Sequence, residues 1–204
     1  MTDYKLTYFD IRGGRGEPIR IAMHAAGITF DDHRITFQEF GETRQSFRFG
    51  CVPILEIDDT VVTQSNAMLR YFGQLAGLYP EDPLQALYCD EVMGACEDSF
   101  HQVVKTFGKQ GEQLAAARQK LTEQWFVPFF TGIGELLERG GDRYFADERL
   151  TVADLKIVAH VGSVRAGTLE HVPTDLIDEI APNLVAHQER VQKDPIVEAY
   201  YASL

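Results

Sequence analysis

The spacing of hydrophobic and polar residues along the chain changes near residue 80. Before that point, short runs with the period of a strand alternate with segments that have the period of a helix. We predict strands at residues 5–9, 32–36, 54–57 and 61–63, and helices at residues 17–26 and from residue 65 onward. Residues 58–60 fit a tight hairpin, and residues 37–53 are predicted to be a loop. This order predicts a small mixed sheet with helices packed on it.

Capping and stop signals define the ends of the two helices. Pro18 suits the first turn of a helix, and Gly27 is a typical stop signal. Ser65 is a favourable N-cap residue for the second helix. In that helix Met68, Phe72 and Leu75 are spaced to share one face.

The chain after residue 83 is predicted to be helical throughout. Residues 79–83, Tyr-Pro-Glu-Asp-Pro, have the composition of a linker. An apolar stripe then follows helical spacing from Leu84 to Phe107, and a second long helix is predicted at residues 121–137, kinked or interrupted by Pro128. Thr151 and Asp154 fit a capping box for a further helix. We therefore expect two domains, at residues 1–78 and 84–204.

Composition and charge narrow the class of protein. The 204 residues contain 31 acidic and 19 basic side chains, which gives a formal charge of −12. Such a charge repels nucleic acids and anionic membranes, so neither is an expected partner. Three cysteines without metal-ligand spacing predict reduced thiols and no metal site. Because the first ten residues also lack an apolar signal core, we expect a cytoplasmic protein.

Four features are candidates for chemistry, and each also has a structural explanation. Tyr8 ends the first strand before a glycine-rich loop that contains Arg15. Pro53 enters a strand, where proline is ordinary. Ser65 could bind an anion at a helix N-terminus or serve only as a cap. Asp98 lies on the long helix, by default on its solvated side. Among the cysteines, Cys51 could be accessible, whereas Cys89 and Cys96 are expected in the core.

In combination, these features resemble one family, the cytosolic glutathione transferases, and within it the sigma class. The resemblance covers essentially the whole chain. Its densest segments are Tyr4-Lys-Leu-Thr-Tyr-Phe9, Arg15-Gly-Glu17, Asp32-His-Arg-Ile35, Phe49-Gly-Cys-Val-Pro-Ile-Leu-Glu56, Gln64-Ser65 and Thr151-Val-Ala-Asp154. It implies an α/β thioredoxin-like N-terminal domain, an all-α C-terminal domain, and a homodimer.

The resemblance also implies roles for residues of the first domain. Tyr8 matches the catalytic tyrosine that hydrogen-bonds the glutathione sulfur, and Arg15 matches an arginine that adds positive charge beside it. Val52 matches the residue whose backbone pairs with the cysteinyl part of glutathione, and Pro53 matches the family's cis-proline. Glutathione is a co-substrate here, and no further cofactor is implied.

The γ-glutamyl end of glutathione is expected at Gln64 and Ser65. Asp98 matches, within one residue of alignment, an acidic residue that reaches across the dimer toward the γ-glutamyl amine. Three positions bear on the remaining contacts. Phe40 replaces a hydrogen-bonding tryptophan and Cys51 replaces a lysine, which leaves Arg44 as the cation expected to hold the glycine carboxylate.

By family position, Ile11, Gly13, Val104 and Phe107 are expected to line an apolar pocket for the electrophile. The resemblance therefore predicts a transferase that conjugates glutathione to small apolar electrophiles. Prostaglandin isomerisation gains no support, because the aromatic residue expected on the second-domain helix is not matched. Two alternatives stay open: a ligand-binding or structural protein on the same fold, and a thiol–disulfide oxidoreductase that uses Cys51.

Overall fold

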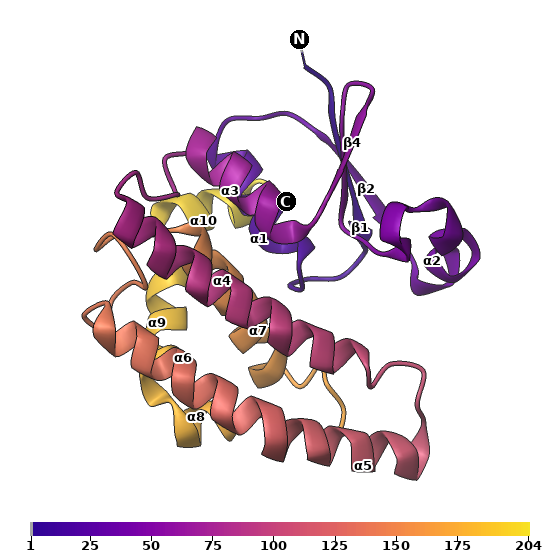
Figure 1. Ribbon diagram of the computed structural model, residues 1–204, viewed down its shortest axis with the longest axis vertical. Coiled ribbons are helices and arrows are strands. Elements are labelled where there is room, and N and C mark those ends of the chain that lie inside the picture. Colours follow the sequence, from indigo (N-terminus) through magenta and orange to yellow (C-terminus); the bar gives the residue numbers. More distant parts are fainter. Residues whose placement is uncertain (1) are drawn as a thin grey trace.

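The computed structural model describes residues 2–204, in which a small sheet with three helices is followed by a larger helical half (Figure 1). The first half contains strands β1 (Tyr4–Phe9), β2 (Asp31–Ile35), β3 (Ile54–Ile57) and β4 (Thr60–Thr63), and helices α1 (Gly16–Ala25), α2 (Phe37–Thr43) and α3 (Ser65–Leu75). The second half contains α4 (Pro83–Val104), α5 (Gly111–Leu121), α6 (Val127–Arg139), α7 (Val152–Arg165), α8 (Leu176–Ile180), α9 (Pro182–Gln192) and α10 (Pro195–Ala202). The predicted fold class, an α/β domain followed by an all-α domain, is confirmed.

The strands form one mixed sheet in the order β2-β1-β3-β4. β1 pairs in parallel with β2, which α1 connects to it, and antiparallel with β3. The tight hairpin between β3 and β4 is confirmed: Ile57 pairs with Thr60, and Asp58 has a φ of 50° in the turn. Helices α1 and α3 pack together beside the sheet, whereas α2 lies away from them at the other side of the sheet (Figure 1).

The prediction of a loop between β2 and β3 was wrong, because this segment contains α2. The structure shows why a helix forms there. The Thr36 hydroxyl accepts a hydrogen bond from the Glu39 amide, and the Glu39 carboxylate accepts one from the Thr36 amide. This capping box supplies a helix start in a segment that buries no residue of α2. Two short 3₁₀ turns, Arg44–Ser46 and Arg48–Gly50, then lead toward β3.

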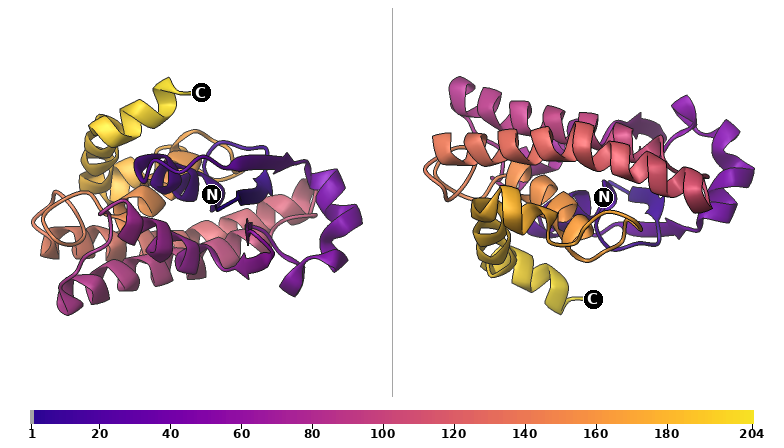
Figure 2. Two further views of the ribbon diagram at one scale, coloured as in Figure 1. Left: turned by 90° about the horizontal axis from the view of Figure 1, so that it is seen from above. Right: turned by 90° about the horizontal axis from the view of Figure 1, so that it is seen from below.

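In the second half, the long helices α4 and α6 lie side by side (Figures 1 and 2). The predicted interruption at Pro128 is present, but it lies before the proline. Residues Thr122–Phe126 form a π-helical segment, and regular α-helix resumes at Val127. Because proline has no amide hydrogen to donate to the preceding turn, the helix readjusts on the N-terminal side of Pro128.

The apolar stripe of α4 is buried only along its middle. Val92, Met93 and Cys96 are fully buried, whereas Leu84 and Val104 near the helix ends are exposed. The shared face predicted for α3 is likewise only partly correct, because Met68 and Phe72 are buried but Leu75 is exposed. Periodicity predicts which side of a helix is apolar, but the length of the covering elements decides how much of it is buried.

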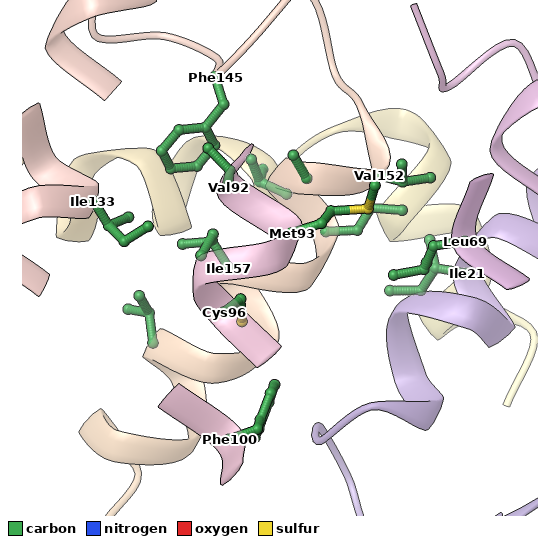
Figure 3. Close-up of a cluster of buried hydrophobic side chains, with 14 of the residues drawn as sticks. Ile21, Leu69, Val92, Met93, Cys96, Phe100, Ile133, Phe145, Val152 and Ile157 are labelled. Carbon is green, nitrogen blue, oxygen red and sulfur yellow. The ribbon is translucent and has the colours of Figure 1, made fainter. Parts of the chain in front are cut away.

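The hydrophobic core is continuous across the two halves. Figure 3 shows Ile21 and Leu69 of the first half close to Met93 and Val152 of the second. The close packing leaves no room beside α3 at Gly73, where a Cβ atom would lie 2.8 Å from a methyl group of Val152. The two predicted domains therefore pack as one body, and side chains of α7 can reach the start of α3. None of the helices in residues 2–204 is both long and apolar enough to cross a bilayer.

Candidate functional site

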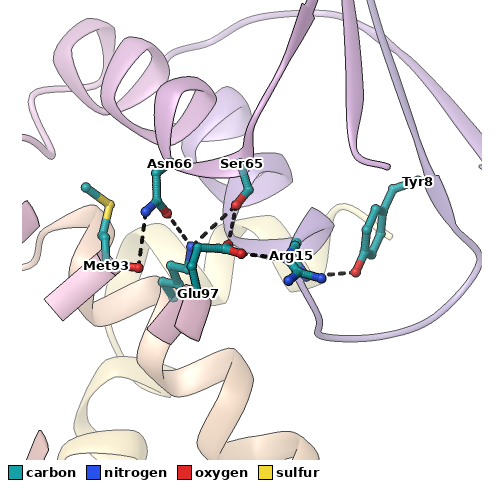
Figure 4. A network of polar contacts seen from close by, with 7 residues as sticks. Tyr8, Arg15, Ser65, Asn66, Met93 and Glu97 are labelled. Atoms are coloured by element: carbon teal, nitrogen blue, oxygen red, sulfur yellow. Dashed lines mark hydrogen bonds and ion pairs between the residues drawn. The ribbon is translucent and has the colours of Figure 1, made fainter. Parts of the chain in front are cut away.

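The site is built around Tyr8, which lies at the end of β1 with only 5% of its surface exposed. Its hydroxyl oxygen accepts a hydrogen bond of 3.0 Å from the backbone amide of Arg15 (Figure 4). The hydroxyl hydrogen is then still available for a ligand. The strand end thus presents a phenol whose oxygen is fixed in place by the loop that follows.

Two glycines allow the loop to approach the ring this closely. A Cβ atom on Gly16 would lie 2.4 Å from a ring carbon of Tyr8, and one on Gly14 would lie 2.7 Å from its hydroxyl oxygen. The sequence predicts that these glycines let the backbone approach a ligand. In the structure, the backbone approaches the tyrosine itself, so the glycines are required for the position of Tyr8.

The environment of Tyr8 keeps the phenol protonated. Burial raises its pKa, whereas the hydrogen bond from the Arg15 amide and the charge of Arg15 lower it, and the result lies above the ordinary value. A protonated phenol is a hydrogen-bond donor at neutral pH. Tyr8 can therefore stabilise an anion at its hydroxyl without itself becoming one.

The side chain of Arg15 turns toward helix α4. Its Nε donates a hydrogen bond of 2.8 Å to Glu97, and its guanidinium lies 5.0 Å from the centre of the Phe100 ring. Arg15 was predicted to add positive charge beside a ligand sulfur. It acts on Tyr8 mainly through its backbone amide, while its side chain is paired with a carboxylate.

Ser65 is the first residue of α3, so its predicted role as the N-cap was wrong. Gln64 holds the N-cap position with a φ of 78°, and no side chain caps the helix there. The Ser65 hydroxyl instead donates a hydrogen bond of 2.5 Å to Glu97. Helix α3 therefore begins at a polar cluster that also includes Arg15.

Three members of this polar cluster, Glu97, Asn66 and Lys156, were not predicted. The Nζ atom of Lys156 lies 2.5 Å from Glu97 Oε1 and also hydrogen-bonds to Asn66 Oδ1. Figure 4 shows Ser65 and Asn66 at the N-terminus of α3 next to Glu97 and Met93 of helix α4. A signal was present in the sequence, since Lys156 interrupts a run of apolar residues in a predicted helix. The spacing of residues around Lys156 does not indicate that its partner is Glu97, which lies 59 positions away in the chain.

Glu97 is held as a carboxylate by two cations. Burial alone raises the pKa of Glu97, but the charges of Lys156 and Arg15, with hydrogen bonds from Lys156 and Ser65, lower it to about 2. Glu97 therefore remains charged at any physiological pH, as the centre of an ionic cluster inside the fold.

Replacing Glu97 by glutamine is expected to lower the free energy of unfolding at pH 7 by up to about 3 kcal/mol, at ~1.4 kcal/mol per pKa unit. The folded-state pKa of Glu97 lies below its ordinary value of 4.5, so the stabilisation is complete above that pH. It is lost as the pH falls toward 2, and parent and variant should converge over that window. Denaturant titrations at several pH values measure this. The control is Glu91→Gln, which removes an exposed ion pair on the same helix and should lower the free energy of unfolding by less than about 1 kcal/mol. A difference between the parent and Glu97→Gln that does not change with pH would contradict the expectation.

A second small cluster forms the wall beside Tyr8. Tyr8 and Val52 are buried in it, and Phe40 packs against them. The Val52–Pro53 peptide bond is cis, as predicted. The guanidinium of Arg44 lies over the ring of Phe40, with its Cζ atom 5.6 Å from the ring centre. Cys51, which precedes Val52 in the chain, is half-buried.

Other predicted site residues lie away from this centre or are exposed. Asp98 is exposed on α4, on its predicted solvated side. Val104 and Phe107 are 46% and 51% exposed near the end of α4. Gly13 lines a cavity of about 780 Å³ between α1, α7, α9 and α10. Tyr8, Ile11 and Val104 do not line that cavity. The electrophile pocket at Ile11, Gly13, Val104 and Phe107 stays a prediction.

Comparison with known proteins agrees with this arrangement. The family profile "Glutathione S-transferase, N-terminal domain" matches residues 4–74, and "Glutathione S-transferase, C-terminal domain" matches residues 97–204. The chain is 31% identical to a hematopoietic prostaglandin D synthase of Gallus gallus, over 98% of this chain and 96% of that protein. It is 30% identical to glutathione S-transferase 1 of Ascaris suum, over 80% of this chain and 81% of that protein.

Solved structures give the same result. A prostaglandin synthase D of Nilaparvata lugens is 28% identical, covers 98% of this chain with 97% of its own, and superposes with a TM-score of 0.82. A thioredoxin-like half with a tyrosine site, joined to a helical half, defines the class of protein as a glutathione-dependent transferase. The chain belongs to the glutathione S-transferase family and is a transferase.

Proposed function

We propose that this transferase conjugates the thiolate of glutathione to small apolar electrophiles, as a sigma-type cytoplasmic enzyme of detoxification. The observation that carries the proposal is the buried Tyr8 hydroxyl, which accepts a hydrogen bond from Arg15 and keeps its own hydrogen for a sulfur anion. The thiolate attacks the electrophilic carbon, the carbon–sulfur bond forms, and the leaving group departs with the electron pair of its bond.

The strength of this interaction fits the task. A free thiol has a pKa near ~8.5, so only a few per cent is ionised at pH 7. Lowering that pKa by about two units requires ~2.7 kcal/mol of preferential thiolate stabilisation. One charge-assisted hydrogen bond contributes ~1.5–3 kcal/mol. Tyr8 alone can therefore supply most of the activation.

The rest of the glutathione site follows from the wall and the polar cluster. We place the cysteinyl backbone at Val52, beside the cis-Pro53 bond, and the γ-glutamyl carboxylate at Ser65 with Gln64. Phe40 packs but cannot donate a hydrogen bond, and Cys51 provides no cation. Arg44 is then the cation at this end for the glycine carboxylate.

A homodimer is part of the proposal. The ring of Phe49 is 73% exposed on the turn before β3, where its φ is 63°. Aromatic rings are enriched in protein interfaces, so Phe49 is a candidate contact of the dimer that the family resemblance implies. In such a dimer, Asp98 of one subunit would approach the γ-glutamyl amine bound to the other, as the family resemblance implies.

The decisive experiment measures glutathione binding by calorimetry and conjugation of 1-chloro-2,4-dinitrobenzene on the same preparation. Glutathione binding with turnover supports the proposal. Tight binding of apolar dyes with no detectable glutathione binding would favour a ligand carrier instead, for which Phe40 and Cys51 would account. Sedimentation of the same sample tests the dimer, and a mass of 23.0 kDa would contradict it.

A further inference from the structure

We propose that Lys156 is a positioning residue that makes this site selective for the γ-glutamyl carboxylate of glutathione. The inference rests on the proposed function and adds a specificity-determining residue to it. Lys156 lies on α7 in the helical half and is only 1% exposed, yet it reaches the first two residues of α3 in the other half.

The contacts of Lys156 use its whole donor capacity. The ammonium group bonds to Glu97 Oε1 at 2.5 Å, to Ser65 Oγ at 3.4 Å, and to Asn66 Oδ1. Asn66 is itself oriented, because its amide nitrogen donates to the carbonyl oxygen of Met93 at 3.2 Å (Figure 4). An ammonium has three hydrogens, so Lys156 acts on a ligand through Ser65 and Glu97 and not by direct contact.

The charges of the cluster do not cancel. Arg15 and Lys156 are both positive, and Glu97 between them is negative. Apart from burial, the charges that shift the pKa values of the buried neighbours Cys96 and His160 come from these same three side chains. Among the residues that the structure describes, Arg15, Lys156 and Glu97 thus form a cluster with a net charge of +1.

An uncompensated charge inside a protein is costly, and an anion placed beside it is correspondingly favoured. The excess charge lies below the N-terminus of α3, an eleven-residue helix whose first amides point the same way. Since the whole chain carries a charge of −12, its overall field opposes an anionic ligand. Lys156 supplies a local positive charge near Ser65 that attracts an anion there despite the negative charge of the whole chain.

The binding of the glutamyl carboxylate would change the hydrogen bond that the Ser65 hydroxyl makes. In the ligand-free chain, Ser65 gives its hydroxyl hydrogen to Glu97. A carboxylate that arrives at Ser65 competes with Glu97 for that hydrogen and brings two negative charges together. With Lys156 and Arg15 both bound to Glu97, the two carboxylates share two cations, which makes the arrangement neutral overall.

The test is a comparison of two ligands on parent and variant. Glutathione is compared by calorimetry with γ-aminobutyryl-cysteinyl-glycine, which lacks only the glutamyl carboxylate. We expect the parent to prefer glutathione by about a hundredfold, in the range of a charge-assisted hydrogen bond. In Lys156→Gln, glutathione should bind about tenfold more weakly, whereas the affinity for the analogue should change less than about threefold.

Control variants separate this role from a general effect on folding. Lys156→Arg keeps the charge and should recover most of the preference for glutathione. Lys120→Gln removes the same charge from an exposed position of α5 and should leave both affinities unchanged. If Lys156→Gln weakened both ligands equally, Lys156 would have only a structural role and the proposal would be wrong.

The outcomes also distinguish this proposal from the function itself. A parent that binds no glutathione would contradict the proposed function before any variant is made. A parent that binds glutathione and the analogue equally well would overturn the carboxylate selectivity alone, even if no neutral Lys156 variant folded.

Discussion

Tyr8→Phe should lose about tenfold to a hundredfold in the rate of glutathione conjugation at pH 6.5, with a loss of only about 1 kcal/mol in the free energy of unfolding. The ring is buried and would stay in place, because the substitution removes only the hydroxyl oxygen that the Arg15 amide contacts. The rate falls because the sulfur of bound glutathione is less often ionised. Without the phenol donor, the thiol of bound glutathione returns toward its ordinary pKa, and the reactive anion becomes scarce near neutral pH.

The pH dependence is the sharper readout. Tyr8 remains a donor over the working range, because the ordinary pKa of a tyrosine already lies well above neutral pH and burial raises the pKa of Tyr8 further. The parent rate should level off once the bound thiol is ionised, and the profile of the variant should be displaced upward by about two pH units. At pH 9 the two rates should approach each other, since most glutathione is then a thiolate without assistance.

Tyr71→Phe is a matched control for this experiment. Its hydroxyl lies 3.1 Å from that of Tyr4 in an exposed contact, and it makes no hydrogen bond to the polar cluster among the described residues. This variant should retain the rate and the pH profile of the parent. If Tyr8→Phe also kept both, Tyr8 would have no part in thiolate stabilisation and the proposed mechanism would be wrong.

The fold could be predicted from the sequence where local signals coincide with burial. The β3–β4 hairpin, the helix from Gly16 and the capping box at Thr151 each combine a periodic pattern with a turn or cap residue, and all three are present. Helix α2 was missed because its capping box lies in a segment without an apolar stripe. Local capping chemistry, which needs only the four residues from Thr36 to Glu39, prevailed there over the hydrophobic pattern.

The site could be predicted only in part, for a different reason. Tyr8, Val52 and Ser65 lie in one strand end, one loop and one helix start, so their types carry recognisable signals. Lys156 and Glu97 acquire their roles from contacts between residues 59 positions apart in the chain. A long-range ion pair of this kind depends on how α4 and α7 pack, and no local spacing encodes it.

Asp154→Ala should be the most destabilising single substitution we predict, with a loss of about 4 kcal/mol in the free energy of unfolding. The carboxylate is fully buried and satisfies three other residues at once. One oxygen accepts from the amide and the hydroxyl of Thr151, each at 2.7 Å. The other lies 3.1 Å from the amide of Phe145 and 2.9 Å from Nε2 of His187. Alanine would leave these polar groups buried without a partner.

The chain contains its own control, because a second capping box with the same local geometry is exposed. In that box Glu39 accepts from the amide and the hydroxyl of Thr36 at the start of α2. Water can replace a lost acceptor there, so Glu39→Ala should cost only about 1 kcal/mol. Urea titrations followed by circular dichroism measure both values. Equal losses for Asp154→Ala and Glu39→Ala would mean that Asp154 stabilises only its own helix end, and that its contacts with Phe145 and His187 contribute nothing to holding the helical half together.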